Sequence, residues 1–163
     1  MNPKQNKNDR ILIMGVGNYL MADEGIGVHA AQLLSERDIP GADVVDGGTG
    51  GFHLLEYFEE YDRIILVDAT LDKQPVGTIR LIRPRFASDF PVAMSTHDIG
   101  LKDLTSAIQL LDRQPDIHLF VVSIESIQQQ GVELTADMEA VMPELLVRIT
   151  DLAFELTQEA VPA

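Results

Sequence analysis

The apolar positions of this chain follow two kinds of pattern that alternate along the sequence. Nearly continuous apolar runs predict buried β-strands at residues 10–15, 64–68 and 117–123. A shorter run predicts a strand at residues 42–46, and an alternating apolar and polar pattern predicts another at residues 77–82. Because the alternating strand has only one apolar face, we expect it at an edge of the sheet, antiparallel to its neighbour.

Helical periodicity appears between and after these strands, with apolar residues recurring every three or four positions. The apolar faces comprise Ile26, Ala30, Leu33 and Leu34; Leu54, Leu55 and Phe58 of a helix at residues 52–59; Leu101, Leu104, Ile108 and Leu111; and a long stripe of Met138, Val141, Met142, Leu145, Ile149, Leu152, Ala153 and Leu156. For the last helix we expect Thr135 as the N-cap, and Pro143 predicts a kink or a restart.

Strands that alternate with helices are typical of the α/β class. We expect a three-layer sandwich, in which a mainly parallel, twisted five-stranded sheet has helices on both faces. The 163 residues suit a single domain, with a polar tail at residues 1–9 and the α/β domain at residues 10–158.

The composition of the chain argues against several classes of protein. The chain has no cysteine, which excludes disulfides, thiolate metal sites and cysteine nucleophiles. Its 12 basic and 26 acidic residues give a net charge of −14, with no basic cluster for nucleic acid. The first apolar run, residues 11–14, is too short for a secretory signal or a membrane span. We expect a cytoplasmic monomer that binds neither nucleic acid nor membrane.

Acidic residues follow three of the predicted strands. Asp23 and Glu24 come after the first strand, Asp46 ends the second, and Asp68 ends the third. Because the carboxyl ends of parallel strands share one edge of the sheet, where ligands bind, these four carboxylates should lie together. Their repulsion favours a bound cation or a shared proton. His97 lies in a loop that could reach the same edge.

Glu24, Asp68 and His97 form a suitable ligand set for a borderline divalent metal ion. Each also has a simpler explanation, since Glu24 could cap a helix and Asp68 could begin a turn. The other histidines are expected to be structural, because they lie in predicted helices or a strand: His29, His53 and His118.

A dinucleotide site is the main rival hypothesis. Gly15 and Gly17 match the first two glycines of the GxGxxG pattern, and Asp46 lies where a ribose-binding acid could sit. However, Leu20 replaces the third glycine, and two acids precede the helix, where they would repel a pyrophosphate. We therefore expect no binding of NAD or NADP. A non-catalytic metal-binding or scaffold protein is a third hypothesis.

Four segments in order resemble those of the hydrogenase maturation protease family, which processes nickel-iron hydrogenases. They are GVGNYLMADEGIGV, DGGTGG, VDA and STHDIGL, at residues 15–28, 46–51, 67–69 and 95–101. The resemblance spans residues 11–156 and implies that Glu24, Asp68 and His97 bind the metal. It also implies that the substrate is a nickel-loaded precursor of the hydrogenase large subunit, from which a short C-terminal extension is removed just beyond the cysteine motif that holds the nickel.

The resemblance leaves the chemistry open. The nickel is expected to arrive with the precursor, and another divalent metal is the alternative. A metal-polarised carbonyl or a metal-bound water would start amide hydrolysis, whereas Asp46 or Asp68 could act as a general base on water. Gly47, Gly48 and Thr49 are candidate substrate-binding residues, because a glycine-rich loop lets a peptide backbone approach closely, although turn formation also explains it. Residues 124–131 (IESIQQQG) depart from the family pattern and are expected to influence partner choice.

Overall fold

The computed structural model describes residues 9–49, 54–85, 89, 109–111, 114–125 and 130–159 of the chain. All five predicted strands are present: β1 (Ile11–Gly15), β2 (Ala42–Asp46), β3 (Arg63–Thr70), β4 (Ile79–Ile82) and β5 (Asp116–Ser123). The helical elements are the 3-10 turn η2 (Ala22–Gly25), α1 (Ile26–Ser35), α2 (Leu55–Glu60) and α4 (Ala136–Gln158). Most of the helix predicted around residues 101–111 lies outside the described residues.

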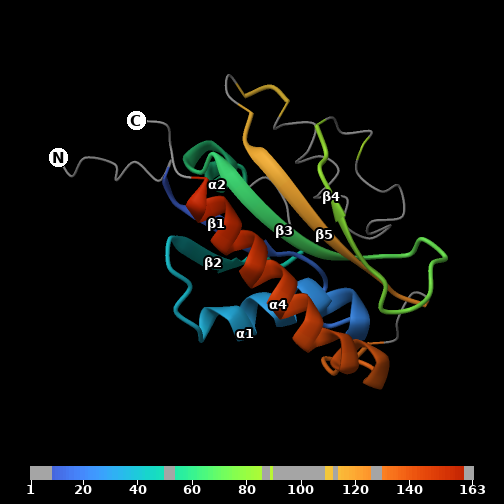
Figure 1. Cartoon of the computed structure of the whole chain (residues 1–163). Helices are drawn as coiled ribbons and strands as arrows, with labels where there is room; N and C mark the ends of the chain where they lie inside the picture. The colour runs from blue at the N-terminus through green and yellow to red at the C-terminus, as the bar shows by residue number, and fades with distance from the viewer. Residues whose placement is uncertain are drawn as a thin grey trace.

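The five strands form one sheet in the order β2-β1-β3-β5-β4 (Figure 1). β1 pairs in parallel with both β2 and β3, and β3 pairs in parallel with β5. β4 is antiparallel to β5 at the edge, which confirms the prediction for this strand. The chain runs from β1 outward to β2 and then returns past β1 to β3. This reversal makes the β1–β3 boundary the switch point, where ligands bind in open α/β sheets.

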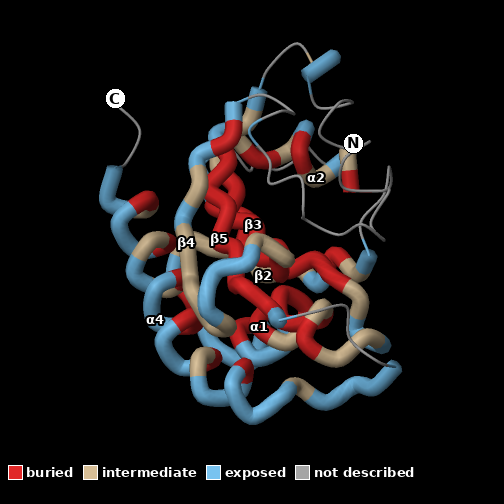
Figure 2. Tube along the Cα trace, turned by 90° about the vertical axis from the view of Figure 1, so that its right-hand side faces the viewer, coloured by how far each residue is buried: buried red, intermediate tan, exposed pale blue. Residues whose placement is uncertain are grey.

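Helices cover both faces of the sheet, so the three-layer prediction is confirmed. α1 and α4 pack on one face, where Ile13, Val67 and Leu145 belong to a single buried cluster. On the other face Leu66 packs with Phe58 of α2. Adjacent strand residues alternate between the two clusters, as the pleat requires. Figure 2 shows the buried residues concentrated along the central strands and on the inner sides of the helices.

α4 continues as one helix through Pro143, so of the predicted kink or restart the restart is wrong. Pro143 is exposed, while Met142 and Leu145 beside it are buried against the sheet. Packing of this apolar stripe offsets the one helical hydrogen bond that proline cannot donate. No helix in the described part of the chain has the length and apolar character needed to cross a bilayer.

β3 is also longer than predicted. It continues two residues beyond Asp68 to Thr70, because β5 runs beside it as far as Ser123. Asp68 therefore lies inside a strand, paired with Val121, and does not begin a turn.

Candidate metal-binding and peptidase site

The loop that follows β1 is held against the carboxyl end of β3. The Val16 N–H donates to the carbonyl of Val67 at 2.9 Å, which continues the pairing of β1 with β3. Two residues later the Asn18 N–H donates to the carbonyl of Glu24 at 3.2 Å, so the loop turns back on itself. This fold brings the η2 turn, with Glu24, against β3.

Gly17 lies where the loop passes between Glu24 and Asp68. A Cβ atom at this position would be 2.3 Å from the carbonyl oxygen of Glu24 and 3.5 Å from Oδ1 of Asp68. The residue also has φ of +146°, a value that side chains disfavour. The structure thus places Gly17 close to the backbone of Glu24 and to the side chain of Asp68, so both residues border the same glycine at the carboxyl end of β3.

Asp68 is buried, with 2% of its surface exposed. The pairing of β1 with β3 ends at Gly15 and Val67, and Asp68 is the next residue of β3. Its Oδ1 accepts a hydrogen bond of 2.8 Å from the N–H of Ala69, which fixes the orientation of the carboxylate. A carboxylate this deeply buried is costly unless hydrogen bonds or a cation compensate it, so its position at the switch point favours a functional role.

Glu24 is half-buried in η2, and its backbone is bonded on both sides. Its N–H donates to the carbonyl of Met21 at 3.1 Å, and its carbonyl accepts from Asn18. The helix-capping explanation for Glu24 is wrong, because Gly25 is the N-cap of α1 and no side chain caps either η2 or α1.

Asp23 precedes Glu24 in η2, but its side chain bonds to the N-terminus of the last helix. Both of its oxygens accept hydrogen bonds from Thr135, one from the N–H and one from the hydroxyl, each of 2.8 Å. Thr135 is the N-cap of α4, as predicted, but its hydroxyl bonds to Asp23 rather than to its own helix. The expectation that four carboxylates share the site is wrong for Asp23, which bonds at the N-terminus of α4, where a negative charge is favourable.

The structure does not bring Asp46 together with Asp68. In β2, Val44 packs in the cluster of α1 and α4, and Val45 packs against the opposite one, so Asp46 points toward the α1 face. There its carboxylate accepts from the N–H of Gly48 at 2.9 Å and from the amide of Gln32 in α1 at 3.5 Å.

The side chain of Asp68 lies on the opposite face of the sheet from that of Asp46. Val67 packs on the α1 face, so the next residue along β3, Asp68, points to the other face. β1 lies between β2 and β3, which separates the strands of the two aspartates further.

The candidate substrate-binding residues border the site loop. The carbonyl of Gly48 accepts from the N–H of Gly17 at 2.8 Å, and Gly47 packs on the side chains of Met14 and Val16. Gly48 has φ of +57° and open space around it, and Thr49 is exposed. Turn formation thus explains Gly48, close packing against Met14 and Val16 explains Gly47, and the turn is bonded directly to Gly17.

The third predicted ligand, His97, lies outside the described residues, as does His53. Within the described ranges, no three histidine or acidic side chains are close enough together to hold a metal ion. The Glu24 and Asp68 pair therefore needs a further ligand from elsewhere in the chain or from a substrate.

A feature that the sequence did not indicate joins residues 130–135 to the site loop. Met21 and Gly131 form an isolated parallel bridge. The Gly131 N–H donates to Leu20 at 2.8 Å, and the Ala22 N–H donates to Gly131 at 2.7 Å. The end of the segment that departs from the family pattern is thus bonded to the loop that presents Glu24.

Several known proteins are similar to this chain in sequence. The sequence profile of the HycI hydrogenase maturation proteases matches residues 28–152. Hydrogenase 2 maturation protease of Escherichia coli K12 is 32% identical over 157 residues, which cover 94% of this chain and 96% of that protein. Hydrogenase expression/formation protein HupD of Bradyrhizobium diazoefficiens is 38% identical over 129 residues, 76% of this chain and 66% of the longer relative.

Solved structures agree with this relationship. Hydrogenase maturating endopeptidase HybD from E. coli has a TM-score of 0.79 at 33% identity, covering 90% of this chain and 93% of that one. The HybD protease from Thermococcus kodakarensis has a TM-score of 0.73 at 28% identity, covering 88% and 99%. The comparisons do not support a Rossmann-like oxidoreductase. The chain belongs to the hydrogenase maturation protease family, whose members are peptidases.

Proposed function

We propose that this chain is the endopeptidase that removes the C-terminal extension from a nickel-loaded precursor of a nickel-iron hydrogenase large subunit. The main structural support is the buried Asp68 at the switch point, on the strand against which the η2 turn with Glu24 packs, with Gly17 close to both residues. It acts as a monomer in the cytoplasm, and neither nucleic acid nor membrane takes part.

Nickel enters this proposal as part of the substrate, held by the cysteines of the precursor. The donor set suits it, because carboxylates and an imidazole bind divalent ions of borderline softness. Glu24, Asp68 and His97 would occupy the positions that the precursor leaves open on the ion. If the resting enzyme binds a metal itself, another divalent ion is the candidate for the same residues.

The residues have distinct roles in the proposed reaction. The nickel supplies a positive charge that polarises the scissile carbonyl. Asp68, held rigidly in β3, is the better candidate for a general base on the attacking water, because it faces the site. Asp46, on the opposite face, instead holds the turn at Gly48. That turn, with Gly47 and Thr49, would position the extended substrate backbone beside Gly17.

The proposed function is tested with purified precursor in nickel-loaded and nickel-free forms. Intact mass of the large subunit reports whether the C-terminal extension is removed. We expect the wild-type enzyme to cut only the nickel-loaded form, and His97→Ala to cut neither. Equal cutting of the nickel-free form would show that nickel is not the recognition element, and no cutting of either form by the wild-type enzyme would reject the function.

A further inference from the structure

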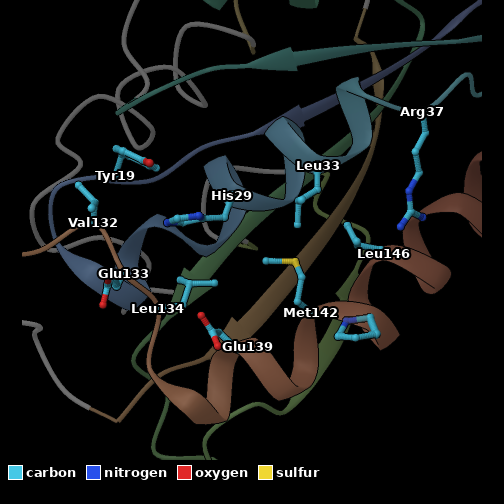
Figure 3. Close-up of a pocket in the computed structure, with 11 residues that line it drawn as sticks. Tyr19, His29, Leu33, Arg37, Val132, Glu133, Leu134, Glu139, Met142 and Leu146 are labelled. Atoms are coloured by element: carbon cyan, nitrogen blue, oxygen red, sulfur yellow. The ribbon is translucent and has the colours of Figure 1, made fainter.

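A groove opens between α1, α4 and residues 132–134, next to the site loop (Figure 3). It encloses a cavity of about 580 Å³. Leu33 of α1 faces Met142 and Leu146 of α4 across it, and Val132 lies at one end. Leu33 and Val132 are 42% and 44% exposed, although both are aliphatic. Clustered exposed apolar side chains of this kind are typical of an interaction site.

Three charged side chains of the groove form no ion pair with any residue that the structure describes. Arg37, Glu133 and Glu139 line it, yet none of them forms an ion pair within the described part of the chain. Arg10 and Arg80, in contrast, are each paired with an aspartate elsewhere on the surface. Figure 3 shows Glu133 toward the Tyr19 end and Arg37 toward the opposite end. The groove therefore has an acidic end and a basic end.

One buried polar atom also lies there. Nε2 of His29 makes no hydrogen bond within the described residues, while its ring lies 4.9 Å from that of Tyr19. Buried polar groups are usually satisfied in a complete assembly. The groove thus offers a hydrogen-bonding position that a bound chain can fill.

The wall of the groove is continuous with the candidate active site. Tyr19 lies in the loop between Gly17 and Glu24, and the Leu20 carbonyl beside it accepts from Gly131 at 2.8 Å. Leu20 is itself 59% exposed, so the site loop next to Tyr19 also presents an apolar side chain. A chain that occupies the groove therefore lies next to the residues that present Glu24.

We propose that this groove docks a segment of the hydrogenase precursor that is separate from the cleaved bond, an inference that rests on the function proposed above. The charges specify its chemistry. A lysine or arginine lies against Glu133 and Glu139, an aliphatic side chain fills the space between Leu33 and Met142, and an acidic residue pairs with Arg37. Docking there determines which precursor is accepted and orients it toward Glu24.

Steady-state kinetics with nickel-loaded precursor test the docking site. Glu133→Lys and Leu33→Asp change exposed or half-exposed positions and should leave the fold intact, as checked by thermal melting. Each should raise KM about tenfold or more with little change in kcat, because a lost docking contact weakens ground state and transition state alike. The matched control is Val147→Asp, an exposed apolar position of α4 outside the groove. Unchanged KM in both groove variants of an active enzyme would reject docking here while leaving the proposed function in place.

Crosslinking gives an independent readout, because the chain has no cysteine to compete with an introduced one. A benzophenone maleimide on Leu33→Cys should crosslink to the precursor, and mass spectrometry should locate the crosslink in a segment with basic, aliphatic and acidic residues in that order. The same label on Val147→Cys should give little crosslinking. Equal yields from the two positions would overturn the proposal.

Discussion

Asp23 and Thr135, which are 112 positions apart in the sequence, join the site loop to the N-terminus of the last helix through two hydrogen bonds. The Asp23 carboxylate accepts from both the N–H and the hydroxyl of Thr135, at 2.8 Å each, and is 2% exposed. Because Glu24 is the next residue, the N-terminus of α4 fixes the position of a proposed metal ligand.

Asp23→Ala should lower the free energy of unfolding by about 1–3 kcal/mol, since it leaves two donors of Thr135 without their acceptor. Thr135→Val should cost less, because the backbone N–H still bonds to Asp23. In a urea-denaturation double-mutant cycle, the two changes should be non-additive by at least about 0.5 kcal/mol. Asp137→Ala, which removes an exposed acid in the first turn of α4, is the control. Additive effects of the Asp23 and Thr135 variants would contradict the pairing.

Gly17→Ala should damage both stability and cleavage. The new Cβ would lie 2.3 Å from the carbonyl of Glu24, a backbone atom that no rotamer change can move away. We expect a loss of more than about 1 kcal/mol of unfolding free energy and a displaced Glu24. Gly131→Ala is the matched control, because a Cβ there meets nothing within 4 Å. Thermal melts and the precursor cleavage assay report the two effects, and wild-type behaviour of Gly17→Ala would disprove the close approach.

His118 should make stability depend on pH. It is buried in β5, and burial, with a smaller effect from nearby Arg83, lowers its pKa below the ordinary 6.5, although Asp116 opposes this. As pH falls below about 6.5, the unfolded chain takes up a proton that the folded protein does not, so stability decreases. Above that pH the histidine is neutral in both the folded and the unfolded chain, so it does not contribute to the pH dependence of stability.

The measurement is the melting temperature of wild type and His118→Leu at several pH values from about 7.5 to 5. The variant should lose less stability than wild type as the solution is acidified through the lower part of this range. Parallel curves for the two proteins would show that His118 does not titrate differently in the folded and unfolded states.

The strands of this fold could be predicted from sequence because each one has a short apolar run or, for β4, an alternating apolar and polar pattern. The orientation of the acids at their ends could not. A parallel strand with apolar residues on both faces has no polar face to mark its orientation, so no local pattern indicates that Asp46 and Asp68 point to opposite faces. The end of β3 was also missed, because its last residues are ordered by pairing with β5.

The candidate site was only partly predictable for a similar reason. The shared edge of Glu24 and Asp68 follows from strand order, which the alternation of elements indicates. The bond from Asp23 to Thr135 depends on tertiary contact between distant segments, and no local pattern marks it. Asp23 and Glu24 are neighbours with similar side chains, and only the packed structure separates their roles.

Cleavage of nickel-loaded precursor by Asp68→Asn tests the account most directly, with intact mass of the large subunit as the readout. Asparagine keeps the shape of the side chain and the acceptor for the N–H of Ala69, so the variant should fold, which circular dichroism can verify. We predict a loss of about 10²–10⁴-fold in cleavage rate, as expected for a lost ligand or base. Asp46→Asn, measured alongside, should retain most of the activity. Wild-type cleavage by a folded Asp68→Asn would contradict the assignment of the site.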